Sequence, residues 1–171
     1  MKRIALLAIA AIAFAASSVA QKYALVDMEY ILKNIPSYEM ANEQLNQVSQ
    51  RWQKECDDKA AEAKTMYQNY QSDLVFLTEE MKVKREEEIR NKETEVVELR
   101  RKYFGPEGEL FKKREILMKP IQDDIYNAIK KISEDKGYSM VIDRASSPNI
   151  IFASPKIDIS NEVLTKLGYS K

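Results

Sequence analysis

The chain has 171 residues and balances 27 basic against 27 acidic side chains, so its formal net charge at neutral pH is zero. This balance gives no general attraction to nucleic acid, which proteins bind through an excess of lysine and arginine. There is no histidine, so the commonest general base and metal ligand is missing. Cys56 is the only cysteine, which excludes an intrachain disulfide and leaves either a small apolar helix residue or an intermolecular disulfide.

Residues 1–20 form a predicted secretory signal peptide. A basic start precedes a short apolar run, and the small residues Ser18 and Ala20 occupy the −3 and −1 positions. The run is shorter than the roughly 20 residues that a transmembrane helix needs. We therefore expect cleavage before Gln21, which leaves 25 basic and 27 acidic residues and a net charge of −2. The mature protein is expected to be soluble, extracytoplasmic and of one domain.

A short strand and a long helix are predicted to follow. Tyr23–Met28 is rich in strand-forming residues. From Ser37 to Phe104 there is neither glycine nor proline, and apolar residues recur every three or four positions, which predicts a coiled-coil seam. The seam slips once, where Trp52, Cys56 and Ala60 are each four residues apart. Such a stutter changes the supercoil locally.

A second, narrower seam lies further along the chain. Its members are Ile89, Val96, Tyr103, Leu110 and Leu117, which recur every seven residues. The companion positions are mostly charged or polar, and many glutamates stand four residues before a lysine or arginine. This pattern predicts a long solvated helix rather than part of a globular core.

The chain must reverse between the two seams, and two positions compete. A turn at the glycine-rich Gly105–Gly108 would join helices of very unequal length. A turn near 77–79, with Thr78 as the N-cap of a new helix, gives nearly equal arms of roughly 60 Å. We favour the turn near 77–79, which makes residues 37–119 a hairpin with a kink at 104–108.

The remainder, residues 21–36 and 120–171, is predicted to be a small β-containing body that the returning arm re-enters at Pro120. Its later elements are a helix capped by Gly137, a strand at Tyr138–Asp143, a turn at Ala145–Asn149, a strand at Ile150–Ala153 and a short helix at Asp158–Gly168. A body this small rarely builds a sufficient core alone, and its strand edges are exposed. We therefore expect an obligate oligomer that shares one sheet or barrel. The oligomer-core candidates are Leu25, Val26, Val141, Ile142, Ile150, Ile151 and Phe152.

The order and spacing of these parts resemble the Skp/OmpH family of periplasmic chaperones. The likeness covers essentially the whole mature chain, from YALVDMEYIL to GYSMVIDR and the last helix, although LVDM and MVID are ordinary strands. It implies an α+β fold, a homotrimer with a central β-barrel, and helical arms around a cavity that holds unfolded outer-membrane proteins. It also implies no nucleotide, cofactor or metal. The near-neutral charge departs from the basic members, so lipopolysaccharide binding is not carried over, and FGPEG matches no general feature of the family.

In this interpretation, apolar residues near the arm tip contact the client. The candidates are Met66, Val75, Phe76, Leu77 and Met81. A plainer alternative assigns Tyr67, Tyr70, Leu74 and Leu77 to the hairpin seam. Tyr103, Phe104 and Phe111 either form a similar patch at the kink or pack against Trp52 on the opposite arm.

Three rival functions compete with this interpretation. A structural coiled-coil scaffold or linker of the cell envelope is the main alternative. An enzyme would have to rely on Asp27, Glu29 and Asp143 as clustered carboxylates, without histidine, phosphate loop or metal-ligand spacing. Binding to a membrane surface needs a basic helix with a wide apolar face, which neither arm has. We therefore expect no catalysis and no stable membrane insertion.

Overall fold

The computed structural model describes residues 21–169, which form two compact units. Unit 1 comprises residues 21–34 and 125–169, and unit 2 comprises residues 35–124. The predicted signal peptide lies outside the described residues. No helix of the described part is long and apolar enough to span a membrane.

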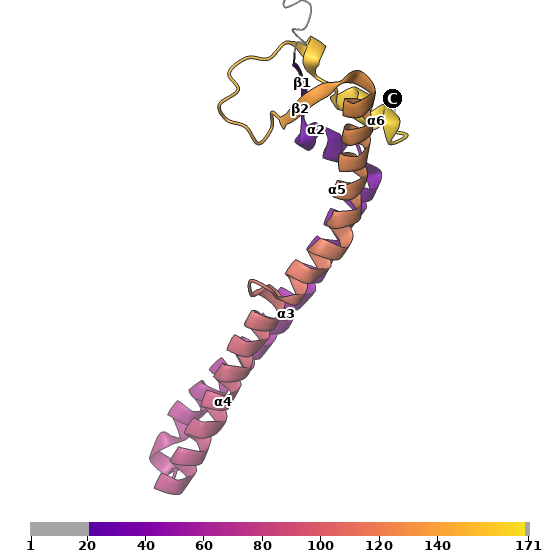
Figure 1. The fold of residues 1–171 in the computed structure, drawn as a ribbon. Coiled ribbons are helices and arrows are strands. Elements are labelled where there is room, and N and C mark those ends of the chain that lie inside the picture. The colour runs from indigo at the N-terminus through magenta and orange to yellow at the C-terminus, as the bar shows by residue number, and fades with distance from the viewer. Residues whose placement is uncertain (1–20, 170–171) are drawn as a thin grey trace, which may run out of the picture. The chain divides into compact units, whose positions relative to one another are not determined.

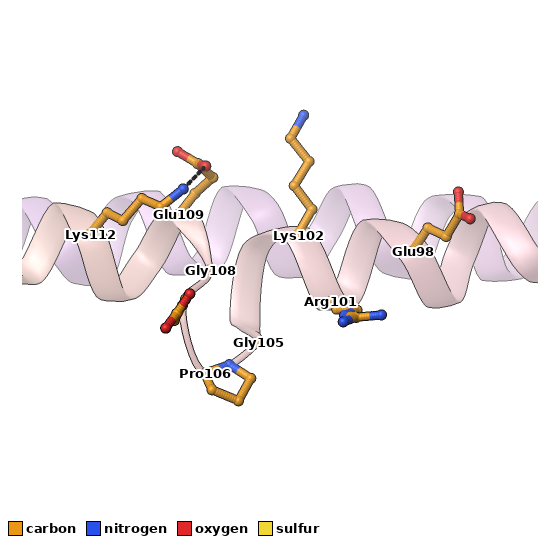
Figure 2. Close-up of a pocket in the computed structure, with 9 residues that line it drawn as sticks. Glu98, Arg101, Lys102, Gly105, Pro106, Gly108, Glu109 and Lys112 are labelled. Atoms are coloured by element: carbon orange, nitrogen blue, oxygen red, sulfur yellow. Dashed lines mark hydrogen bonds and ion pairs between the residues drawn. The ribbon is translucent and has the colours of Figure 1, made fainter.

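Unit 2 is a helical hairpin (Figure 1). Its elements are α3 (Pro36–Asp73), the 3₁₀ turn η1 (Leu74–Phe76), α4 (Glu79–Phe104) and the first part of α5 (Glu109–Lys136). Helix α3 begins with Pro36 in its first turn, where a missing N–H costs nothing. The chain reverses at η1, and the Thr78 hydroxyl caps α4 by accepting from the Met81 N–H. Beyond Gly105–Gly108, α5 continues in line with α4 (Figure 2).

The core of unit 2 is one thin row of side chains. Its buried apolar residues are Ile35 just before α3, Ala41, Leu45, Val48, Cys56, Ala63 and Tyr70 from α3, Ile89, Val96 and Tyr103 from α4, and Ile121 from α5. Leu110 and Leu117, which continue the seven-residue row into α5, are half-buried. Because several of these side chains are alanine or cysteine, apolar burial contributes little per turn of helix.

Pro120, where the body was predicted to begin, does not end a helix. Helix α5 runs through it from Glu109 to Lys136, and the boundary between the units falls after Asp124. A proline removes one hydrogen bond to the carbonyl four residues earlier, here that of Ile116. Both Ile116 and Pro120 are exposed, so water can solvate that carbonyl and the helix tolerates the loss.

Unit 1 contains a two-stranded parallel sheet of β1 (Lys22–Val26) and β2 (Tyr138–Asp143). Its helical elements are α2 (Met28–Lys33), the end of α5, the 3₁₀ turn η2 (Pro155–Ile157) and α6 (Ser160–Lys166). The register places Ala24 beside Val141. Gly137 joins α5 to β2 with φ of 71°, a conformation that glycine adopts without penalty. The buried apolar side chains are Ala24, Leu25, Val26, Ile31, Ile125, Ala128, Ile132, Ile159, Val163 and Leu164, and Ser160 is buried with them.

The strand predicted at Ile150–Ala153 is absent, and that prediction was wrong. The segment has no regular secondary structure, and Ile151 and Phe152 are 99% and 84% exposed. A strand requires a partner edge for its backbone hydrogen bonds. Within the described residues β2 pairs only with β1, while the far side of β1 meets the chain at Asp158.

Candidate functional site

The hairpin tip exposes a compact group of apolar side chains. Val75 and Phe76 lie in η1 and are 87% and 84% exposed, and Met81 in the first turn of α4 is 47% exposed. Leu77 and Met66 are half-buried. Of the five predicted contact residues, three are therefore exposed and two lie partly within the hairpin.

The tyrosines near the tip divide between the seam and the surface. Tyr70 is buried and donates its hydroxyl hydrogen to Glu86 on α4, so it belongs to the seam. That hydrogen bond raises the pKa of Tyr70 to about 12. Tyr67 is half exposed, and its hydroxyl accepts from Gln71 one turn later. Leu74, at 38% exposure, lies at the end of the seam.

Charged groups form one layer of the hairpin below the tip. Lys92 lies 3.1 Å from Glu62 across the two helices and 2.9 Å from Glu95 on its own helix. Lys59 completes the layer, 3.4 Å from Glu62 and 3.7 Å from Glu95. The hydrogen bonds from Lys92 lower the pKa of both carboxyl groups, and they raise the pKa of Lys92 in turn. Ion pairs thus occupy a level of the arm at which an ordinary coiled coil has apolar side chains.

The arm also carries a loop, Gly105–Gly108, between α4 and α5 (Figure 2). The open hollow beside it has a volume of about 570 Å³ and is lined by Glu98, Arg101, Lys102, Glu107, Glu109, Lys112 and the loop backbone. Both signs of charge are present, so the hollow does not select an ion of one sign. Tyr103 lies just before the loop, and its ring stacks on Trp52 of α3. Of the two expectations for Tyr103, a patch at the kink or packing against Trp52, the structure shows the second. Phe104 and Phe111 remain 37% and 49% exposed.

The oligomer-core candidates do not share one environment. Leu25 and Val26 are buried within unit 1 itself. Val141, Ile142 and Ile150 are half-buried, whereas Ile151 and Phe152 are almost fully exposed.

The carboxylates of the enzyme hypothesis have structural partners. Asp27 caps α2 by accepting from the Tyr30 N–H and also binds the Arg144 guanidinium at 3.0 Å. These contacts lower the pKa of Asp27. Asp143 accepts from the backbone N–H groups of Met28 and Ala145. Glu29 pairs with Lys33 on the exposed surface of α2. In the described part of the chain, no group of three or more cysteine, aspartate or glutamate side chains is arranged to hold a metal ion.

The sequence analysis missed two residues, Arg144 and Ser160, that link Asp27 to Asp158. Arg144 bridges Asp27 and Asp158, at 3.0 and 3.4 Å. The Ser160 hydroxyl donates to Asp158 and accepts from the Asp27 N–H. These residues are far apart in sequence, and only the pairing of β1 with β2 and Asp158 brings them together.

A family model described as outer membrane protein (OmpH-like) matches residues 22–167. The chain belongs to the OmpH-like family. This match confirms the resemblance noted from the sequence. No curated protein matches the chain.

A solved structure shows the same fold. It is the crystal structure of a candidate outer membrane chaperone (OmpH-like) from Caulobacter crescentus CB15, with a TM-score of 0.67. The match covers 88% of this chain and 86% of that one at 10% identity. Long helices with a small sheet are therefore an OmpH-like α+β architecture, as the sequence predicted.

Proposed function

We propose that this chain is a periplasmic holdase chaperone. It binds unfolded outer-membrane proteins between its helical arms and prevents their aggregation, without catalysis or a cofactor. Membership of the OmpH-like family and the fold shared with a candidate outer membrane chaperone support this proposal.

The observation that carries the proposal is the apolar hairpin tip. Its residues Val75 and Phe76 are 87% and 84% exposed, more than any other large apolar residue described in the hairpin. Burying such side chains against a client would stabilise the complex by about 1.5–3 kcal/mol each. The charged helices below the tip disfavour self-association of the arms. Met81 adds a flexible side chain that adapts to varied clients.

The proposed assembly is a homotrimer formed through unit 1. The edge of β2 that does not face β1 is unpaired in the described residues, and exposed Ile151 and Phe152 follow it in the chain. An open edge beside exposed apolar residues favours the addition of a strand from another copy.

The decisive experiment is native mass spectrometry of residues 21–171, alone and after dilution of a urea-unfolded outer-membrane barrel protein into the sample. We expect a trimer that gains the mass of one client chain. A monomer or dimer that leaves the client to aggregate would contradict the proposal and favour a coiled-coil scaffold.

A matched pair of variants tests the tip. Val75→Ser together with Phe76→Ser should weaken client retention about tenfold or more, because two exposed apolar contacts are lost. Val97→Ser is the control, since Val97 is 66% exposed on α4 but away from the tip. Equal retention by both proteins, measured by light scattering of the diluted client, would exclude the tip as the contact.

A further inference from the structure

The last turns of the hairpin before the tip bury no side chain. Tyr70 is the last buried residue of α3, and Ile89 is the first buried residue of α4. All residues from 71 to 88 are exposed or half-buried, including those of the apolar tip. Because a helix rises 1.5 Å per residue, full burial in α3 ends about 10 Å before the chain reverses at η1. The tip therefore depends on few contacts for its shape.

One side-chain hydrogen bond joins the two helices at this level. The Tyr70 hydroxyl donates to a carboxylate oxygen of Glu86 on α4, at 2.5 Å. A charged acceptor makes such a bond stronger than a neutral one. In the described hairpin, no other side-chain hydrogen bond or ion pair joins the helices between this bond and the tip. The next one away from the tip, between Lys92 and Glu62, is about 20 Å from the reversal, so loss of the Tyr70 bond would roughly double the unlinked length.

The same kind of bond occurs far from the tip. Tyr103 of α4 is also buried, and its hydroxyl donates to Glu55 of α3 at 2.9 Å. The two helices exchange roles, but donor and acceptor are chemically the same as in the bond of Tyr70 with Glu86. Glu55 lies about 33 Å along α3 from the reversal. The hairpin therefore contains a matched control, in which an equal bond is placed where it cannot act directly on the tip.

We infer that Tyr70 and Glu86 are a positioning pair, which keeps the helices joined below the tip so that Val75 and Phe76 are presented together to a client. The inference rests on the proposed function, in which these two apolar side chains contact the client. If the helices separate at this level, the tip must be ordered again when a client binds. That ordering costs conformational entropy and weakens binding. The pair therefore acts on client contact through the tip, by reducing what must be ordered.

Hydrogen exchange of residues 21–171 tests the pair without a client. Tyr70→Phe keeps the ring and removes only the hydroxyl, so amides 83–88 should exchange about fivefold faster, as expected for one lost hydrogen bond. Amides 97–103 should be unchanged in this variant. Tyr103→Phe should give the reverse pattern, with faster exchange at 97–103 and none at 83–88. Unchanged exchange of 83–88 in Tyr70→Phe would overturn the inference.

Variants of Glu86 show whether the two residues act as a pair. Glu86→Gln keeps an acceptor oxygen without its charge, so its exchange at amides 83–88 should lie between that of the unaltered protein and that of Glu86→Ala. Glu87→Ala removes the next exposed glutamate and should change nothing. Tyr70→Phe combined with Glu86→Ala should exchange no faster than either single variant, because both remove the same bond. Additive effects would show that the residues act separately and would overturn the inference.

The client experiment separates the pair from the proposed function. A urea-unfolded outer-membrane barrel protein is diluted into each variant, and its retention is followed by light scattering. Tyr70→Phe should retain the client about threefold less well than the unaltered protein, whereas Tyr103→Phe should retain it equally well. Equal retention by the two variants would overturn the role of the pair in client contact. If the unaltered protein retains no client, the proposed function fails and this role with it, while hydrogen exchange still decides whether the pair orders the tip.

Discussion

Trp52 and Tyr103 stack face to face across the hairpin, with ring planes only 4° from parallel. The two residues lie almost equally far along the chain from the reversal at Leu77–Thr78. The stack therefore fixes the pairing of α3 with α4 at the level where α4 ends. Few large side chains share this task, because Cys56 and Ala63 occupy the next buried positions of α3.

Replacing Trp52 by alanine should destabilise unit 2 by about 2 kcal/mol, through lost apolar burial and lost ring stacking. Urea unfolding followed by far-UV circular dichroism measures this loss. Tyr67→Ala is the control, because Tyr67 is half exposed and its hydroxyl is bound by Gln71 of the same helix. A Trp52 variant as stable as the control would show that the pairing of the helices does not depend on the stack.

Thr78→Ala should cost about 1 kcal/mol, because the hydroxyl that accepts from the Met81 N–H is lost at the start of α4. Thr94→Ala removes the same atoms from the middle of α4, where the hydroxyl only donates back to the Arg90 carbonyl. That control should be neutral or slightly stabilising, since such back-bonding weakens a helix. The difference between the two variants in urea unfolding measures the cap alone.

The hairpin could be predicted from the sequence because its signals are local. One signal is the row of apolar residues that recurs every seven positions. Another is the N-cap Thr78 followed by Glu79. Each can be recognised within a few turns of one helix. Once the reversal is placed at 77–79, residues equally far from it must face each other. The facing of Trp52 and Tyr103, which the sequence left as one of two alternatives, follows from this rule.

The body could be predicted only in part because its contacts are not local. Ile150–Ala153 has the composition of a strand, yet a strand also needs an edge that composition cannot supply. A proline is typical of the boundary between two elements, yet the exposed position of Pro120 lets the helix continue through it. The joining of Arg144 to Asp27 and Asp158 depends on strand pairing between distant segments, and no spacing in the sequence indicates it.

Lys92→Met should raise the melting temperature by a few degrees, because a flexible apolar side chain suits a seam position better than an ion pair. Glu62 and Glu95, left without this partner, are about half exposed and stay hydrated. When the salt concentration is raised from about 0.05 to about 1 M, the melting temperature of the unaltered protein should fall more than that of the variant. A lower melting temperature for Lys92→Met, with Lys84→Met unchanged, would show that the charged layer stabilises the arm.

The stability of unit 1 should depend on pH through Asp27. The Tyr30 N–H and the Arg144 guanidinium lower the pKa of Asp27 below its ordinary value of 3.8, so the folded state binds its proton less readily than the unfolded state. The resulting stabilisation is complete above the ordinary pKa and is lost as the pH falls through the lower folded pKa. Asp27→Asn keeps a capping side chain but no charge. The urea midpoints of the two proteins should differ most near pH 5–6 and converge near about pH 2, and a constant difference would exclude the charge as the cause.

Gly108→Ala should destabilise the arm more than deletion of the whole loop does. A Cβ at Gly108 would lie 2.8 Å from the Tyr103 carbonyl oxygen and 2.9 Å from that of Lys102, both of them backbone atoms that cannot turn away. We expect a cost of about 2 kcal/mol, typical of local backbone strain. Deletion of residues 105–108 instead removes the site of this clash and allows a continuous hydrogen-bond ladder. Glu107→Ala is the control at an exposed position of the same loop. Urea unfolding of the three variants should rank Gly108→Ala lowest, and the reverse order would mean that the loop backbone relaxes freely around an added methyl group.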